Sequence, residues 1–216
     1  MLDARNHGTS PWAATMTYPE MAGDVAAYIE ARGLTGAEIL GHSMGGKTAM
    51  TLALTRPELV RRLIVVDIAP VPYRRGAQEP YADYVSAMRA LDLSGLRRRA
   101  DADAALAGAI PDPTLRAFLV QNLEVVEGGY RWRMNIDAIE ANLESLTGFP
   151  VYQSHYDGPT TVIAGELSNY VKPRDEDAIR ARLPSARIVV IDGAGHWPHA
   201  DQPARLLTQV ERALAA

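Results

Sequence analysis

Residues 37–54 read AEILGHSMGGKTAMTLAL, and this stretch decides the fold. Its apolar start, residues 37–40, is predicted to be a strand, and a helical pattern begins directly after GHSMG. Such an abrupt strand-to-helix turn leaves little room beside Ser43, which accounts for Gly41 and Gly45 on either side of it. The alternative is a chance G-x-S-x-G in a glycine-rich turn. We prefer a nucleophile elbow, because a strand and a helix flank the motif on the required sides.

Three further apolar runs have the composition of buried strands, at residues 63–66, 160–164 and 187–191. Helical patterns precede, separate or follow the strand segments, at residues 18–32, 43–55, 175–183 and 203–214. Strands that alternate with helices predict an α/β fold with a mostly parallel sheet. We therefore expect residues 1–70 and 154–216 to form one α/β core.

The middle of the chain differs from this core. Residues 71–153 contain no convincing buried strand and show helical patterns at residues 81–91, 96–108, 114–126 and 136–145. We interpret this segment as a helical cap (a lid) inserted after the second strand. Ligands of open parallel sheets bind at the carboxyl ends of the strands, so such a cap would roof a pocket.

A serine nucleophile needs a base, and a base needs an acid that orients it. His196 follows the last strand in the loop IDGAGHWPH, which fits the chain order of serine, acid and histidine in proteins with such an elbow. Asp67 ends the strand at 63–66, a costly position for a carboxylate that lacks a partner. Glu166, in the loop after residues 160–164, is the alternative acid, while Ser168 stands where a carboxylate is commonest.

Other residues are expected to contact the substrate. The backbone N–H of Met44 would stabilise an oxyanion, helped by the positive end of the following helix. We assign the acyl-binding surface to one histidine and four aromatic residues, for each of which ordinary packing is the alternative: His42, Tyr84, Phe118, Trp132 and Trp197.

Composition excludes several classes of function. The formal net charge of −4 gives no electrostatic footprint for nucleic acid or for an anionic membrane surface. The absence of cysteine excludes disulfides and thiolate chemistry. No apolar run reaches the ~18 residues that span a bilayer, and no hydrophobic signal segment opens the chain. Since neither segment is visible, we expect a cytoplasmic protein. No histidines and carboxylates have metal-binding spacing, so we expect no metal.

The chain resembles the α/β-hydrolases, in particular the small bacterial carboxylesterases of the YbfF-like group. The resemblance covers nearly the whole sequence and is carried by four motifs: DARNHGTS at 3–10, GHSMGG at 41–46, VDIAP at 66–70 and GAGHW at 193–197. It implies hydrolysis of short- to medium-chain acyl esters by Ser43, His196 and Asp67, without a cofactor. It also favours Asp67 over Glu166, because in this group the acid follows the strand after the nucleophile helix.

The sequence departs from that group at its N-terminus, where the usual first strands are not visible. The resemblance then predicts that the elbow strand is an open apolar edge and that the second oxyanion donor is missing. We expect a homo-oligomer that covers this edge, because unpaired edges invite pairing. Thioester hydrolysis, C–C bond hydrolysis, perhydrolysis or acyl transfer by the same triad are alternatives, as is a non-catalytic binding module.

Overall fold

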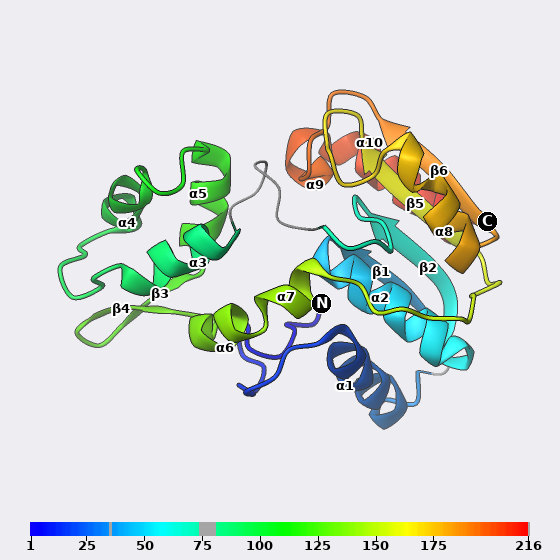
Figure 1. Ribbon diagram of the computed structural model, residues 1–216, viewed down its shortest axis with the longest axis horizontal. Coiled ribbons are helices and arrows are strands. Elements are labelled where there is room, and N and C mark those ends of the chain that lie inside the picture. Colours follow the sequence, from blue (N-terminus) through cyan, green and yellow to red (C-terminus); the bar gives the residue numbers. More distant parts are fainter. Residues whose placement is uncertain (35, 74–80, 216) are drawn as a thin grey trace. The chain divides into compact units, whose positions relative to one another are not determined.

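The computed structural model describes residues 1–34, 36–73 and 81–215 (Figure 1). The chain divides into two compact units. The first combines Met1–Thr17 with Tyr73–Thr147, and the second combines Tyr18–Pro72 with Gly148–Ala216. Within the described ranges, no helix is long and apolar enough to cross a membrane.

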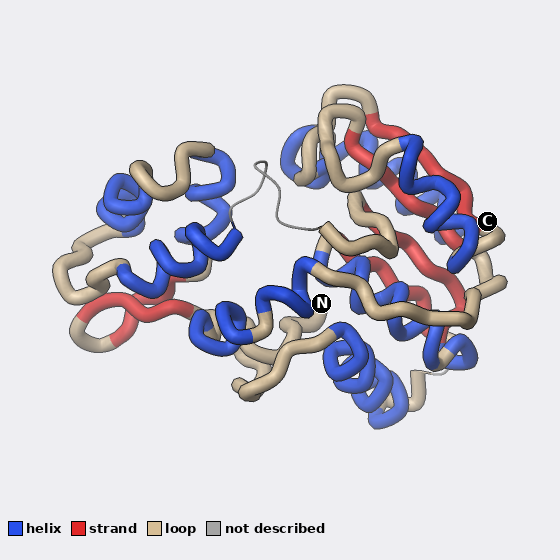
Figure 2. Tube along the Cα trace, viewed as in Figure 1, coloured by secondary structure: helices blue, strands red, loops and turns tan. Residues whose placement is uncertain are grey.

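A parallel four-stranded sheet lies at the centre of the second unit, in the order β1-β2-β5-β6. All four predicted strands are confirmed, because each apolar run in the sequence became one strand of this sheet (red in Figure 2). Every residue of β5 is buried and most of β2 is buried, as continuous apolar runs require. The bounds are β1 (Ala37–His42), β2 (Val60–Val66), β5 (Thr160–Gly165) and β6 (Ala186–Ile191).

Helices cover the sheet of this unit. Helix α2 (Met44–Thr55) packs on β1 and β2, and α1 (Tyr18–Ala31) packs against α2. Figure 1 shows α2 in front of the strands and α10 (Pro203–Ala215) behind them. Leu206 and Val210 of α10 pack onto a buried cluster that includes Ile64 and Ile163. The remaining short elements are η1 (Pro57–Leu59), η2 (Pro173–Asp175), α8 (Glu176–Arg182) and α9 (Pro198–Asp201).

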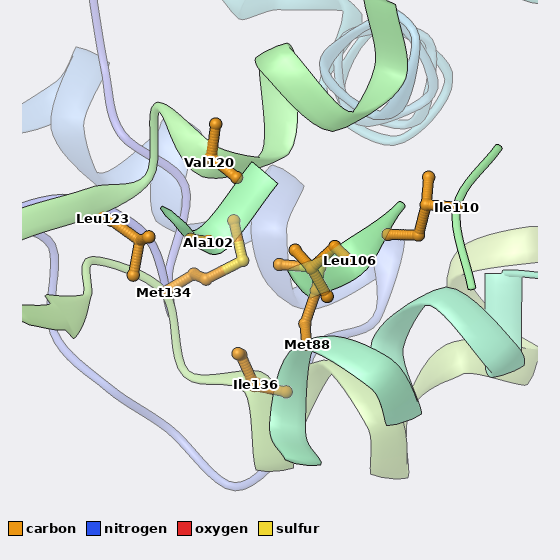
Figure 3. Close-up of a cluster of buried hydrophobic side chains, with 8 residues drawn as sticks. All are labelled: Met88, Ala102, Leu106, Ile110, Val120, Leu123, Met134 and Ile136. Atoms are coloured by element: carbon orange, nitrogen blue, oxygen red, sulfur yellow. The ribbon is translucent and has the colours of Figure 1, made fainter. Parts of the chain in front are cut away.

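The first unit is mainly helical, as the sequence predicted for residues 81–145. It contains α3 (Tyr81–Ala90), α4 (Arg99–Leu106), α5 (Pro113–Val120), α6 (Ile136–Ala141) and α7 (Leu143–Thr147). Its helices and a hairpin enclose a separate apolar core, drawn in Figure 3: Met88, Ala102, Leu106, Ile110, Val120, Leu123, Met134 and Ile136. A unit with its own core is a compact body, and we call it the cap.

The cap differs from the prediction at residues 114–126, where a single helix was expected. Helix α5 ends at Val120, and the antiparallel hairpin β3 (Leu123–Val126) and β4 (Gly129–Trp132) follows it. Gly128 and Gly129 have φ values of 87° and 149°, which residues with side chains rarely adopt. These two glycines allow the tight reversal, and β-branched and aromatic residues on either side suit a strand.

The N-terminal segment also differs from the predicted division, which placed residues 1–70 in the core. Met1–Thr17 belongs to the cap unit. The carbonyl of Asn6 accepts a hydrogen bond from the backbone of Asn135 at 2.8 Å, and Gly8 donates one to Arg133 at 2.7 Å. These bonds join the N-terminal segment to the chain leading into α6, so the motif at residues 3–10 structures the cap.

Candidate active site

Ser43 occupies the turn between β1 and α2. Its backbone has φ 52° and ψ −120°, a left-handed conformation that is strained for a residue with a side chain. The amide of Ser43 donates to the carbonyl of Val66 at 3.0 Å, which extends the pairing of β1 with β2 by one residue. The elbow is therefore fixed to the end of the neighbouring strand.

The space available for a side chain differs among the three glycines around Ser43. A Cβ on Gly41 would lie 2.2 Å from the carbonyl oxygen of Gly45, so no side chain fits there. A Cβ on Gly46 would lie 2.6 Å from Cγ2 of Ile68. At Gly45 an added Cβ would meet nothing within 4 Å. The expectation that Gly41 and Gly45 both lack room is therefore wrong for Gly45, and Gly46 is the second crowded position because α2 approaches the chain after β2 there.

His196 lies in the loop between β6 and α9, and its side chain is 15% exposed. Its Nε2 is 2.9 Å from Oγ of Ser43, and its Nδ1 is 2.8 Å from Oδ2 of Asp67. The Asp67 carboxylate accepts a hydrogen bond from Nδ1–H, so Nε2 carries the lone pair that can accept the hydroxyl proton of Ser43. The structure thus joins the three predicted residues by hydrogen bonds.

Asp67 follows β2 directly and is completely buried. Its Oδ1 accepts a hydrogen bond from the amide of Gly165 at 2.8 Å, and its Oδ2 accepts one from the hydroxyl of Ser168 as well as from His196. The amide of Tyr170 donates to the Ser168 oxygen at 3.1 Å, which leaves the Ser168 proton for Asp67. A buried carboxylate is stable only with such partners.

Glu166, the alternative acid, points elsewhere. It is exposed, and its Oε2 accepts a hydrogen bond from the backbone amide of Gly193 at 2.8 Å. Its carboxylate therefore supports the loop that leads to His196 instead of contacting the imidazole. Of the two candidate acids, Asp67 is the one that the structure places against His196.

Aromatic rings surround the His196 imidazole. Tyr170 stacks on it, with ring centroids 3.9 Å apart and an interplanar angle of 28°. Trp197 meets it edge-on at 5.3 Å. Trp197 was expected at the site from the sequence, whereas the contacts made by Tyr170 and by the hydroxyl of Ser168 were not. Both residues could have been suspected from their position, because they lie in the loop after β5, one of the two places considered for the acid partner of His196.

Met44 is the first residue of α2, so its N–H belongs to the amides at the helix start that have no acceptor within the helix. His42, the last residue of β1, directs Nε2 to the backbone carbonyl of His196 at 2.7 Å. Burial lowers the pKa of His42 to about 4, with the neighbouring His196 as the second cause. His42 is therefore engaged with the loop of His196, whereas the sequence assigned it to the substrate.

The other expected substrate residues belong to the cap. Tyr84 and Trp132 are partly buried and pack against the apolar core of that unit. Phe118 is 45% exposed. Core packing accounts for Tyr84 and Trp132, and acyl binding by any of the three remains a prediction. Among the described residues, histidines and carboxylates form no group that could hold a metal ion.

Comparisons with known proteins identify the family of the chain. A family model described as alpha/beta hydrolase fold matches residues 1–203. The chain is 38% identical to the mouse (Mus musculus) sn-1-specific diacylglycerol lipase ABHD11, over 99% of this chain and 70% of that protein. It is 34% identical to esterase YbfF of Escherichia coli, over 99% of this chain and 81% of the relative.

A solved structure titled marine microorganism esterase is also similar, with 38% identity and a TM-score of 0.90. The match covers 97% of this chain and 82% of the esterase. The shared fold and the named relatives identify the chain as a hydrolase of the esterase and lipase group. The chain belongs to the alpha/beta hydrolase fold family.

Proposed function

We propose that this protein is a serine carboxylesterase that hydrolyses short- to medium-chain acyl esters through an acyl-enzyme. The observation that carries the proposal is the hydrogen-bonded series from the Ser43 hydroxyl through His196 to Asp67. Nucleophile, base and acid stand in hydrogen-bond order, and each bond length lies between 2.8 and 2.9 Å.

In the first step the Ser43 oxygen attacks the ester carbonyl while Nε2 of His196 takes its proton. The imidazolium is stabilised by the buried carboxylate of Asp67, which accepts a hydrogen bond from the Nδ1–H group and stays ionised. His196 then returns its proton to the departing alkoxide, and the acyl group remains on Ser43. In the second step the oxygen of a water attacks the acyl carbon while Nε2 of His196 takes one of its protons. The bond between the acyl carbon and Oγ of Ser43 then breaks, His196 returns the proton to Oγ, and the acid is released.

The tetrahedral intermediates carry an oxyanion. The Met44 amide at the start of α2 is our proposed donor, because the positive end of the helix favours negative charge there. An active site with a single oxyanion donor should have a kcat on the order of 10²–10³-fold lower than a site with two such donors. The turnover of the protein therefore reports whether a second donor acts.

The proposed substrate class follows from relatives. One of them is named a diacylglycerol lipase and another an esterase, both of which act on carboxylic esters. The cap residues Tyr84, Phe118 and Trp132 and the site residue Trp197 are proposed to meet the acyl chain. Hydrolysis rates measured with p-nitrophenyl esters of increasing acyl-chain length and with acyl thioesters define the preference for chain length and for ester over thioester.

A single comparison tests the function. Ser43→Ala should lower hydrolysis of p-nitrophenyl acetate and butyrate by on the order of 10⁴-fold or more. Ser185→Ala, which removes an exposed hydroxyl bonded to Asp157, is the matched control and should keep wild-type rates. A fluorophosphonate should label the wild type at Ser43, as located by peptide mass spectrometry.

Two outcomes would contradict the proposal. Equal rates for the wild type and Ser43→Ala would show that the hydroxyl is not the nucleophile. A wild type that neither hydrolyses any ester or thioester nor reacts with the fluorophosphonate would favour the non-catalytic binding module.

A further inference from the structure

His42 links the nucleophile's strand to the loop of the proposed base. It is the last residue of β1 and precedes Ser43 directly. Its Nε2 lies 2.7 Å from the backbone carbonyl oxygen of His196, a residue 154 positions later in the chain. The contact therefore joins the two halves of the site through the backbone as well as through the Ser43 hydroxyl.

The direction of this hydrogen bond follows from its acceptor. A carbonyl oxygen can only accept a hydrogen bond, so Nε2 of His42 carries a hydrogen and is the donor. Burial holds the pKa of His42 at about 4, well below its ordinary 6.5. The ring is therefore neutral at neutral pH and does not place a second positive charge beside the imidazolium that forms on His196 during each step.

Further contacts hold the His42 ring in place. Its centroid is 4.9 Å from the ring of His196 and 5.3 Å from the ring of His199, which it meets edge-on. The loop that carries His196 is also held by hydrogen bonds from elements other than β1. Asp201 accepts from the amide of Gly195 at 2.8 Å, and Leu167 donates to the carbonyl of Ala194 at 2.9 Å.

We propose that His42 is a positioning residue: its Nε2–H holds the His196 carbonyl and thereby sets the distance between the imidazole and the Ser43 hydroxyl. This inference rests on the proposed function. It assigns His42 a task different from substrate binding, because Nε2, the donor nitrogen of its neutral ring, is directed to protein backbone. Displacement of a catalytic group by about 1 Å can cost on the order of 10²-fold in rate.

Side chains of defined reach test the role. In His42→Gln the amide nitrogen can take the place of Nε2 and keep the donor. In His42→Asn the amide is one methylene shorter and cannot reach the carbonyl. We expect His42→Asn to lower kcat for p-nitrophenyl butyrate by on the order of 10- to 100-fold with KM nearly unchanged. His42→Gln should restore most of the loss.

His155→Asn is the matched control, because it makes the same change at an exposed histidine whose Nε2 pairs with Asp157 instead of the His196 carbonyl. It should keep wild-type kcat. The rate of fluorophosphonate labelling of Ser43 should fall in His42→Asn in parallel with kcat, since labelling needs the same base. If His42→Asn does not fold by circular dichroism, His42→Leu replaces it as the variant without a donor.

Each result decides the matter. Wild-type kcat in the variant without a donor, an equal loss in His42→Gln, or a raised KM with unchanged kcat would overturn the positioning role, and the last would favour substrate binding. The activity of Ser43→Ala distinguishes failure of the positioning role from failure of the proposed function. If Ser43→Ala is inactive and His42→Asn is fully active, only the positioning role fails. If Ser43→Ala is fully active, both fail.

Discussion

The hydroxyl of Ser168 donates a hydrogen bond to Oδ2 of Asp67 from the loop after β5. This bond ties the ends of two neighbouring strands together behind the proposed base. Because the acid is fully buried, its hydrogen bonds decide its position.

Asp67→Asn should lower kcat/KM for p-nitrophenyl butyrate by about 10⁴-fold at neutral pH. The amide can present its N–H₂ group to Nδ1 of His196 and so favour the wrong tautomer of the imidazole. Steady-state kinetics measure the loss. Glu166→Gln is the matched control, because Glu166 bonds the amide of Gly193 instead of the imidazole. A larger loss in Glu166→Gln than in Asp67→Asn would contradict our assignment of the acid.

Ser168→Ala removes one donor from a buried carboxylate. We expect the free energy of unfolding to fall by about 1–3 kcal/mol, as for other buried groups that lose a partner. Activity should also fall, because Asp67 loses one of the bonds that fix it toward His196. Urea denaturation and steady-state kinetics test both effects. Ser168→Thr keeps a hydroxyl, and if it proved no more stable and no more active than Ser168→Ala, the hydrogen bond would not be the cause.

Gly165 lies where β5 meets the loop of the base. A Cβ there would lie 2.2 Å from the carbonyl oxygen of Gly195, so Gly165→Ala should displace that loop. Overpacking of this kind costs about 1–3 kcal/mol of stability, and kcat should fall with it. Gly23→Ala is the control, because a Cβ at this position in α1 meets nothing within 4 Å. It should instead stabilise the protein by about 0.5–1 kcal/mol in urea denaturation.

Lys47 makes the free energy of unfolding of the protein depend on pH. Its side chain is 1% exposed, its Nζ donates to the carbonyl of Gly148, and it lies 5.5 Å from the ring centroid of Tyr18. Burial lowers its pKa from 10.5 to about 7. Between these values the unfolded chain binds more protons than the folded one, so stability rises with pH.

Urea denaturation from pH 7 to pH 9.5 should therefore show a contribution of about 1 kcal/mol per pH unit in the wild type, up to the limit for one proton. Lys47→Met should lack this contribution, so its stability relative to the wild type should be greatest at the lowest pH of the range. Lys172→Met, at a partly exposed lysine, should keep the wild-type dependence on pH. Parallel profiles for Lys47→Met and the wild type would contradict the lowered pKa.

Strand β1 is an edge of the sheet among the described residues, since its pairing there is with β2. Leu40 on this strand is 51% exposed. We propose that a second copy of the chain covers this edge. Light scattering should show an oligomer, and Leu40→Lys should shift it toward monomer. Leu207→Lys, at a 57% exposed position of α10, should not. A monodisperse wild-type monomer would contradict the proposal.

The sheet and the elbow could be predicted from the sequence because their signals are local. Each core strand is an uninterrupted apolar run, and the G-x-S-x-G motif lies between one such run and a helix. The approach of His196 to Ser43 and Asp67 also followed, since parallel strands place their carboxyl ends along one edge. Only the acid had two candidates, because Asp67 and Glu166 both follow core strands.

The missed features depend on contacts between distant parts of the chain. Strand β3 was predicted as the end of a helix over residues 114–126, because its apolar residues also fit a helical period. The grouping of Met1–Thr17 with the cap depends on pairing with residues near 134, more than 120 positions later. The crowding at Gly46 depends on Ile68 of another element, which no spacing within the elbow motif reveals.

Ser168 and Asp67 reach one another from the ends of two different strands, and Oδ2 of Asp67 contacts both the Ser168 hydroxyl and Nδ1 of His196. Evolution could therefore transfer the acid from one strand to the other without moving the histidine or the nucleophile. A carboxylate at position 168 with a hydroxyl at position 67 would be the mirror arrangement. The double variant Asp67→Ser/Ser168→Asp is thus a direct route to ask how freely a catalytic charge can migrate within one fold.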